Sequence, residues 1–288
     1  MATDTSAEIG VIGGSGFYRF LTGARDVEVD TPFGLPSDPI SVGQLAGRRV
    51  AFVARHGRDH RFPPHQVNYR ANLWALRALG VRQVLAPCAV GSLRPELGPG
   101  TMVVPDQIVD RTWGRAHGVY DDVGPVVHVS MADPYCARGR AAVLAVAAGT
   151  SDDGSGRSGS DGDGSGYGVP VTDGGTLVVV NGPRFSTRAE SQWHAASGWS
   201  IVGMTGMPEA AVARELAVCY TAIALVTDLD AGVEGGEGVT HREVLRVFAA
   251  NVERLKTLVS DVVPALPADG DCPCQHSLDG LTLPFELP

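Results

Sequence analysis

Two aspartates follow an apolar segment late in the chain, in the sequence Thr227-Asp228-Leu229-Asp230. The run Ala222 to Val226 before them predicts a buried strand, and alternation along a strand sends Asp228 and Asp230 to the same side of its end. A protonated carboxyl group can act as a general acid, and an ionised one accepts hydrogen bonds. The pair therefore favours a functional site, with an Asx turn or a helix cap as the structural alternative.

Two other predicted strands end in segments that are suited to phosphate. Gly13-Gly14-Ser15-Gly16 lets backbone N–H groups approach an anion, and its serine adds a hydroxyl donor. Arg55-His56-Gly57-Arg58 offers an imidazole donor and a guanidinium fork that can donate two parallel hydrogen bonds, with His60 close by. We therefore expect a phosphate site, and the structural alternatives are a tight strand-to-helix turn and a solvated basic turn.

Small residues and hydroxyl groups mark two further segments. A third strand ends in Ala86-Pro87-Cys88-Ala89-Val90-Gly91-Ser92, where small side chains let main-chain amides line a pocket. The segment Met204-Thr205-Gly206 opens a predicted helix, so the Thr205 hydroxyl either faces an anion or caps the helix. Each segment alone predicts only a turn or a cap, and the two support a pocket only in combination with the phosphate motifs.

Another helix start lies near residue 186. Ser186 or Thr187 can cap this helix, and Glu190 stands where it would complete a capping box. Phe185, directly before the cap, is either a hydrophobic staple or a platform on which a ring stacks. The sequence leaves both roles of Phe185 open.

Strand-like and helix-like segments alternate along the chain and must position these motifs. The predicted strands are Glu8 to Ile12, Arg49 to Val53, Gln83 to Pro87, Met102 to Val104, Thr176 to Asn181 and Ala222 to Thr227. The predicted helices are Val67 to Leu79, Arg138 to Ala148, Ser186 to Ala196, Glu209 to Tyr220 and His241 to Val263. The alternation favours an α/β fold with a mixed or largely parallel sheet covered by helices.

One domain over residues 1–264 accounts for this pattern. Residues 149–168 are almost all Gly, Ser and Asp, so we expect a flexible insertion in an ordinary helix-to-strand connection. A domain boundary at this insertion is the less favoured alternative. The Pro-rich residues 265–288 predict a C-terminal arm.

The composition excludes several classes of protein. With 288 residues, 44% of them hydrophobic, the chain can bury a large core and does not fit a disordered protein. Its formal charge of -9 argues against a nucleic-acid partner, because a phosphate backbone requires a broad basic face. No uncharged apolar run is long enough to span a membrane, and the first ten residues do not resemble a signal peptide. We therefore predict a cytoplasmic protein with no membrane partner.

The five cysteines form an odd count that does not fit a secreted disulfide scaffold. Cys88, Cys136 and Cys219 lie in apolar sequence, so we expect them to pack in the core. Cys272-Pro273-Cys274 has a one-residue spacing rather than the two-residue spacing usual for zinc or redox sites. We assign this pair no catalytic role.

Taken together, the motifs resemble those of the 5'-methylthioadenosine phosphorylases, in the trimeric purine nucleoside phosphorylase family. The likeness runs from Ile9 to about Pro264, lapses at the insertion, and includes the motifs that contain Ser15, Arg55 and Asp228. It also rests on Pro32-Phe33-Gly34-Leu35-Pro36-Ser37-Asp38, Val67-Asn68-Tyr69, Val90-Gly91-Ser92-Leu93-Arg94, Asp106-Gln107-Ile108 and Gly182-Pro183-Arg184-Phe185-Ser186. The resemblance implies a homotrimer of phosphorylase-type α/β subunits, each with a twisted, mixed central sheet flanked by helices.

The resemblance also implies the activity and the site residues. The reaction is the reversible phosphorolysis of a purine nucleoside in purine salvage, with inorganic phosphate as co-substrate, no metal and no organic cofactor. Phosphate would be held by Ser15, Arg55, His56, Cys88, Ala89 and Thr205, with His60 nearby. The nucleoside would contact Phe185, Met204, Asp228, Leu229 and Asp230, with Ser186 and His241 contributing to specificity. The segment Thr112 to His128 of a neighbouring subunit would close over the 5' end of the substrate.

Asp228 is the candidate general acid of this reaction. Phosphate needs little activation as a nucleophile, so the site must hold it near the anomeric carbon while the purine leaves. A protonated Asp228 can donate to N7 of the purine, and Asp230 can accept from the 6-amino group. A carboxylate repels a 6-oxo group, so the pair predicts a preference for adenine-type nucleosides.

Two residues depart from the family pattern. Cys88 stands where a threonine or a similar donor is usual, so that phosphate contact has to come from the backbone. His241 stands where the animal methylthioadenosine enzymes are apolar and the 6-oxopurine phosphorylases place a histidine beside the ribose 5'-hydroxyl. His241 therefore keeps open a purine nucleoside phosphorylase for adenosine, inosine or guanosine, or an enzyme for 5'-halogenated deoxyadenosines. Its structural alternative is an exposed position at the start of the last helix.

Two functions outside phosphorolysis are alternatives. A dinucleotide-binding oxidoreductase would place a pyrophosphate on the first glycine turn, but this turn lacks the G-x-G-x-x-G spacing. A non-catalytic purine-binding protein would bind adenine and leave phosphate unconsumed. The sequence disfavours the first alternative, and a kinetic assay separates the second.

Overall fold

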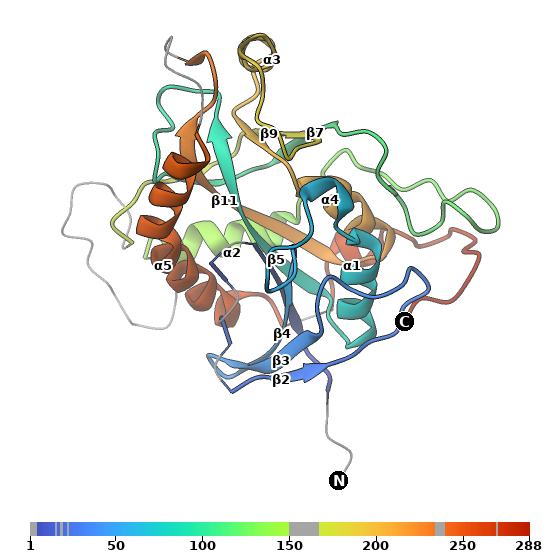
Figure 1. The fold of residues 1–288 in the computed structure, drawn as a ribbon. Coiled ribbons are helices and arrows are strands. Elements are labelled where there is room, and N and C mark those ends of the chain that lie inside the picture. Colours follow the sequence, from blue (N-terminus) through green and yellow to red (C-terminus); the bar gives the residue numbers. More distant parts are fainter. Residues whose placement is uncertain are drawn as a thin grey trace.

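The centre of the protein is one mixed sheet of eleven strands. The structure is a computed structural model that describes residues 5–14, 16–17, 20–21, 23–149, 167–233, 240–268 and 270–288. In chain order the strands are β1 (Ile9–Gly13), β2 (Arg25–Val27), β3 (Ile40–Leu45), β4 (Arg48–Ala54), β5 (Gln83–Ser92), β6 (Met102–Val104), β7 (Gln107–Arg111), β8 (Val171–Asp173), β9 (Thr176–Val180), β10 (Ile201–Gly203) and β11 (Cys219–Leu229). Figure 1 shows helices on both sides of the sheet. The predicted α/β fold with a mixed central sheet is confirmed.

The described helices are η1 (Pro64–Gln66), α1 (Tyr69–Ala78), α2 (Ala137–Ala147), α3 (Arg188–Ala196), α4 (Gly206–Glu215), α5 (His241–Ala265) and η3 (Pro273–His276). Four of the described helices, α1, α2, α3 and α5, begin after a residue whose side chain accepts from a free N–H group of the first turn. Asn68 caps α1 and Thr240 caps α5 through side-chain oxygens. Thr187 and Glu190 form the predicted capping box, so α3 begins two residues later than the sequence predicted.

Strands β5 and β11 lie side by side and parallel over almost their whole length. Strand β1 lies between β4 and β5 and is parallel to both. The carboxyl ends of these four strands therefore meet at one edge of the sheet, where α/β proteins bind ligands. The pairing of β5 with β11 shifts register between Val226 and Asp228, which makes Thr227 an extra residue opposite β5.

Helices α1 and α4 pack against each other on one face of the sheet, and α2 and α5 pack against each other on the opposite face (Figure 1). The first face is covered by an apolar cluster that includes Leu73 and Leu76 of α1. The second face is covered by a cluster that includes Val143 of α2 and Leu258 of α5. These four helices bury apolar side chains against the sheet, and this burial is the main stabilising contribution to the fold.

The predicted C-terminal arm packs against the first of these clusters. Its partly buried apolar residues there are Leu283, Phe285 and Leu287. The centroid of the Phe285 ring lies 5.5 Å from that of Trp74 in α1 and 5.3 Å from that of Tyr120. Helix α5 ends at Ala265, so the arm begins one residue later than predicted.

One predicted helix was too long. The pattern predicted a helix from Glu209 to Tyr220, but α4 ends at Glu215, and Cys219 begins β11. Ala217 has a φ of 50°, in the left-handed region, which is incompatible with a continuing right-handed helix. The apolar residues that follow pair with β5 instead.

Three expectations concern the organisation of the whole chain. Most of the predicted insertion, residues 150–166, lies outside the described residues. Within the described part of the chain, no helix combines the length and the apolar character that crossing a membrane requires. The single domain over residues 1–264 stays a prediction.

Candidate active site

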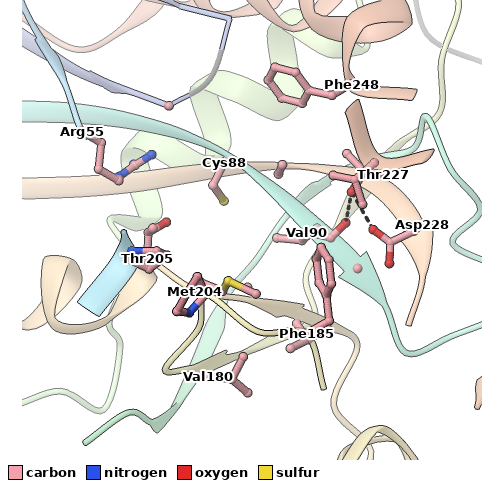
Figure 2. Close-up of a pocket in the computed structure, with 18 of the residues that line it drawn as sticks. Arg55, Cys88, Val90, Val180, Phe185, Met204, Thr205, Thr227, Asp228 and Phe248 are labelled. Atoms are coloured by element: carbon pink, nitrogen blue, oxygen red, sulfur yellow. Dashed lines mark hydrogen bonds between the residues drawn. The ribbon is translucent and has the colours of Figure 1, made fainter. Parts of the chain in front are cut away.

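A cavity of about 270 Å³ opens at the carboxyl edge of the sheet. Figure 2 shows Arg55 and Thr205 towards one end and Phe185 and Asp228 towards the other, and we call these the arginine end and the aspartate end. Most of the predicted site residues line this cavity: Arg55, His56, His60, Cys88, Ala89, Phe185, Ser186, Met204, Thr205, Asp228 and Asp230. Segments far apart in the sequence therefore meet in one place.

The guanidinium of Arg55 is the fixed charge of the arginine end. Its Nε and Nη2 donate to the two carboxylate oxygens of Glu209 at 2.8 Å each, and the two side chains are 2% and 0% exposed. Nη1 and Nη2 also donate to the backbone carbonyl oxygens of Pro87 and Ile12, at 3.1 Å each. Burial opposes the charge, but the Glu209 carboxylate outweighs burial and holds the pKa of Arg55 above its ordinary value.

The fork of Arg55 is therefore not available for a two-bond contact with phosphate, and that expectation was wrong. Four of its five N–H groups are bonded to described residues, and one hydrogen on Nη1 remains. Nη1 lies near Gly14, where an added Cβ atom would stand 3.5 Å from it. The buried Glu209 carboxylate pairs with the guanidinium, and this pairing is needed because an unpaired buried guanidinium would be strongly destabilising.

His56 presents a hydrogen-bond acceptor to the cavity. Its Nδ1 lies 2.8 Å from the carbonyl oxygen of Phe62, which can only accept, so Nδ1 carries the proton. Burial, and then the charge of Arg55, lower the pKa of His56 to about 4, so the ring is neutral at pH 7. Nε2 therefore has a lone pair and no proton. The sequence predicted a hydrogen-bond donor at this position, whereas the structure presents an acceptor to the cavity.

Thr205 offers a hydroxyl that no helix cap uses. It occupies the N-cap position of α4, yet its side chain makes no capping hydrogen bond, and it lines the cavity. Of the two roles that the sequence left open for Thr205, the structure favours the contact with an anion. Ser15, the other predicted hydroxyl donor, lies outside the described residues.

The main chain of β5 is exposed to the cavity beside Cys88 and Ala89. Strand β1 pairs with β5 only up to Leu85, and β10 pairs with it only from Gly91, so the residues between them have one unpaired backbone edge. Burial raises the pKa of the Cys88 thiol to about 11, so it stays protonated and is a weak donor. The thiol is therefore poorly suited to bind an anion, and a phosphate contact from the backbone of this segment stays a prediction.

At the aspartate end, the hydroxyl group of Thr227 lies within hydrogen-bond distance of both Asp228 and a backbone carbonyl oxygen. Oδ2 of Asp228 lies 2.7 Å from Oγ1 of Thr227, which is also 3.2 Å from the carbonyl oxygen of Val90 (Figure 2). A hydroxyl has one hydrogen, so when Thr227 donates to Val90, a protonated Asp228 donates to Thr227. When Asp228 is ionised, Thr227 donates to it. Burial raises the pKa of Asp228 to about 6, so both states are accessible near neutral pH.

Asp230 is buried beside Asp228 and keeps one oxygen for a ligand. Its Oδ2 accepts from Oγ of Ser191 in α3 at 2.5 Å, whereas Oδ1 makes no hydrogen bond to the described residues. Leu229 does not line the cavity, because its side chain lies on the opposite side of the strand from the two aspartates. The predicted contact of Leu229 with the substrate is therefore not supported by the lining of the cavity and stays a prediction.

Phe185 lines the aspartate end of the cavity, whose lining also includes Ser186 and Met204. It precedes the cap residue Thr187 by two positions, and it belongs to no apolar cluster of the described residues. A hydrophobic staple would pack Phe185 on its helix, so the structure favours the stacking platform.

Helix α5 closes one wall of the cavity with apolar side chains. Val244 and Phe248, one turn apart, line the cavity. His241 is the first residue of the same helix, and its side chain lies outside the described residues. A role in specificity was predicted from the sequence for His241, but none was predicted for the two apolar residues that follow it on the helix.

Glu209, the partner of Arg55, was not among the site residues predicted from the sequence. The two residues are 154 positions apart, so no local pattern connects them. One signal was present, because Glu209 is the only charged residue in the run Gly206 to Ala213. A charged residue among small and apolar neighbours at the start of a helix indicates a buried partner.

Comparisons with known proteins agree with this geometry. The sequence model of the phosphorylase superfamily matches residues 8–264. A purine nucleoside phosphorylase of Streptomyces coelicolor is 60% identical over 297 residues, which cover 100% of both chains. An S-methyl-5'-thioadenosine phosphorylase of Mycolicibacterium smegmatis is 52% identical over 282 residues, 97% of this chain and 99% of that one. The crystal structure of a methylthioadenosine phosphorylase from an antarctic soil metagenomic library matches with a TM-score of 0.83 and 36% identity, over 96% of this chain and 92% of that one.

Proposed function

The chain belongs to the phosphorylase superfamily, and from this membership we propose that it catalyses the reversible phosphorolysis of 5'-methylthioadenosine or a related 5'-substituted adenosine. The products are adenine and a 5-substituted ribose 1-phosphate, so the enzyme is a pentosyltransferase. One observation carries the proposal. Two buried aspartates and a buried arginine, with the hydroxyl of Thr205, face the same cavity from opposite ends.

Phosphate binds at the arginine end. The hydroxyl of Thr205, the remaining Nη1 hydrogen of Arg55 and the unpaired backbone edge of β5 donate to its oxygens. Nε2 of His56 accepts from the one phosphate oxygen that keeps its proton. Phosphate is nucleophilic without activation, so this end contributes by holding it beside the anomeric carbon.

The purine binds at the aspartate end. The carboxyl group of Asp228 donates its proton to N7 as the bond to the sugar breaks, and Thr227 then turns its hydroxyl towards the new carboxylate. Oδ1 of Asp230 accepts from the 6-amino group, and Phe185 lies against the base. A 6-oxo purine would present an acceptor to this oxygen and bind more weakly.

The 5' substituent lies against the wall of α5. Val244 and Phe248 offer an apolar surface to a methylthio group, whose transfer from water is favourable. A free 5'-hydroxyl gains nothing from such a surface. Nucleosides with a 5'-hydroxyl are the second candidate substrates, because the Streptomyces coelicolor relative is a purine nucleoside phosphorylase.

A panel of four nucleosides tests the proposal. We expect phosphate-dependent release of base to rank 5'-methylthioadenosine first by kcat/KM, ahead of adenosine, 5'-methylthioinosine and inosine. Adenosine or inosine in first place would overturn the choice of 5' substituent. Binding of adenine without consumption of phosphate would overturn catalysis altogether.

The reaction as proposed uses inorganic phosphate and no cofactor. We also expect a homotrimer, because Trp113 and Val126 are 74% and 78% exposed in the segment that the resemblance places at a subunit contact. Light scattering of the purified protein checks this, and a mass of one or two chains would contradict it. The cytoplasmic location and the role in purine salvage stay predictions.

A further inference from the structure

Four of the five cysteines gather at the end of β11 that is remote from the cavity. Cys219 begins β11, Cys136 caps α2, and Cys272 and Cys274 lie in the C-terminal arm. Their sulfur atoms all lie within 4.8 Å of one another, and all four side chains are more than nine-tenths buried. We call this group the cysteine cluster.

The spacing of the sulfur atoms is close to that of a tetrahedral metal site. Zinc binds thiolate sulfur at about 2.3 Å, which places the sulfur atoms of a tetrahedron about 3.8 Å apart. Sγ of Cys136 and Sγ of Cys272 are 3.6 Å apart, and no pair in the cluster exceeds 4.8 Å. An inward movement of less than about 1 Å would bring every sulfur atom within bonding distance of a central ion.

Hydrogen-bond donors lie beside two of the four sulfur atoms, as they do in thiolate metal sites. The backbone N–H of Gly139 donates to Sγ of Cys136 at 3.4 Å, and Nε2 of Gln275 donates to Sγ of Cys219 at 3.8 Å. Such donors hold ligating sulfur atoms in place and stabilise their negative charge. Arg138 on α2 also donates to the backbone carbonyl oxygen of Asp271, at 2.6 Å, which fixes the arm beside the cluster.

We propose that Cys136, Cys219, Cys272 and Cys274 bind one Zn²⁺ ion as a closed structural site. Four thiolates fill the tetrahedron and leave no position for water or substrate, so the ion has no catalytic role. Soft sulfur ligands select zinc over magnesium or calcium, and binding releases the thiol protons. Zinc was not predicted from the sequence for two reasons. The pair in the arm has a one-residue spacing, and the other two ligands come from distant elements.

The site would fix the arm to the sheet. The arm leaves the cluster and runs to Phe285, which packs on Trp74 and Tyr120 on the face covered by α1 and α4. The cluster and Asp228 lie at opposite ends of β11, about 30 Å apart at 3.3 Å per residue. Loss of the ion should therefore reduce stability and leave the chemistry of the cavity unchanged.

The first test is the metal content of the full-length protein, purified with a thiol reductant and without chelator. We expect about one zinc per chain by mass spectrometry of the elements, and about one zinc bound again when reduced, metal-free protein is titrated with zinc. The matched control is Cys88→Ser, which removes the cysteine outside the cluster and should keep its zinc. Cys272→Ser and Cys274→Ser should lose most of it.

If a cysteine variant fails to fold, two further measurements on the wild-type protein still test the proposal. Cobalt added to the reduced, metal-free wild-type protein should give the visible absorption of tetrahedral thiolate coordination. Removal of zinc should lower the melting temperature by several degrees and leave kcat for the nucleoside unchanged. Four titratable thiols with no zinc retained would overturn the proposal, as would an intact mass that shows disulfides in the freshly purified protein.

Discussion

The two ends of the cavity are built differently. At the arginine end the side chains of Arg55 and His56 already have partners, because Arg55 is bonded to Glu209 and to two backbone carbonyls, and His56 to the carbonyl of Phe62. At the aspartate end, Asp230 keeps an oxygen without a described partner, and the pKa of Asp228 is about 6. In the proposed reaction phosphate therefore meets side chains that are fixed by folding, whereas the base meets one carboxyl group, Asp228, whose protonation can change. We therefore expect the arginine end to position phosphate and the aspartate end to transfer a proton to the base.

The largest effect that we expect is on catalysis at the aspartate end. Asp228→Asn keeps the shape of the side chain and removes its proton, so kcat should fall about 10²- to 10⁴-fold. The KM for phosphate should stay within a factor of about two, because Asp228 lies at the far end of the cavity. Steady-state kinetics with both substrates varied measure this. A parallel loss of phosphate binding would mean that the two ends are not separate.

At the arginine end we expect stability and phosphate binding to fall together. Glu209→Gln leaves the buried guanidinium of Arg55 without a counter-charge, which should cost about 3–5 kcal/mol of unfolding free energy. The matched control is Glu253→Gln, which breaks an exposed pair with Lys256 and should cost less than about 1 kcal/mol. Urea unfolding of both variants, with phosphate titrations, provides the comparison. Equal stabilities would show that the pair of Arg55 and Glu209 does not hold this end in place.

The raised pKa of Asp228 predicts that the aspartate end lowers stability at neutral pH. The folded protein binds this proton more tightly than an unfolded aspartate does, with a pKa of about 6 against 3.8. The stabilising contribution is therefore complete below pH 3.8 and lost as the pH rises through 6. At pH 8, Asp228→Asn should be more stable than the wild type by on the order of 3 kcal/mol, and near pH 4 by much less. A gain that does not change with pH would contradict the assignment.

The smallest effect concerns the choice of base. Asp230→Asn replaces a charged acceptor by a neutral amide, which should reduce the preference for 6-amino over 6-oxo nucleosides about 10- to 100-fold. Phosphate affinity and the melting temperature should change little. The ratio of kcat/KM for 5'-methylthioadenosine and 5'-methylthioinosine measures this preference. An unchanged ratio would remove Asp230 from the recognition of the base.

Local patterns in the sequence predicted the fold class and most of the cavity. Gly14 and Arg55 each directly follow an apolar strand, Asp228 lies at the end of another, and all three line the cavity. The prediction succeeded because parallel strands bring their carboxyl ends to one edge of a sheet. For these residues, the residue type and the position at a strand end were enough to predict that they line the cavity.

Features that depend on distant partners could not be predicted in this way. The fork of Arg55 faces Glu209 rather than phosphate because of a contact between residues 154 positions apart. Strand β10 has three residues, too few for an alternation pattern, and the cysteine cluster joins three separate segments of the chain. The helix predicted to Tyr220 failed because apolar residues suit both a helix and a buried strand, and pairing with β5 decided between them.

The contact of Phe285 with Trp74 and Tyr120 has a consequence for synthesis of the protein. A ribosome releases Trp74 and Tyr120 long before Phe285 is made, so the apolar surface that these rings form stays uncovered on the growing chain. Chaperones that recognise exposed apolar segments would have their target during this interval. A nascent chain arrested before residue 285 would therefore be sensitive to proteases, even with every strand of the sheet already made.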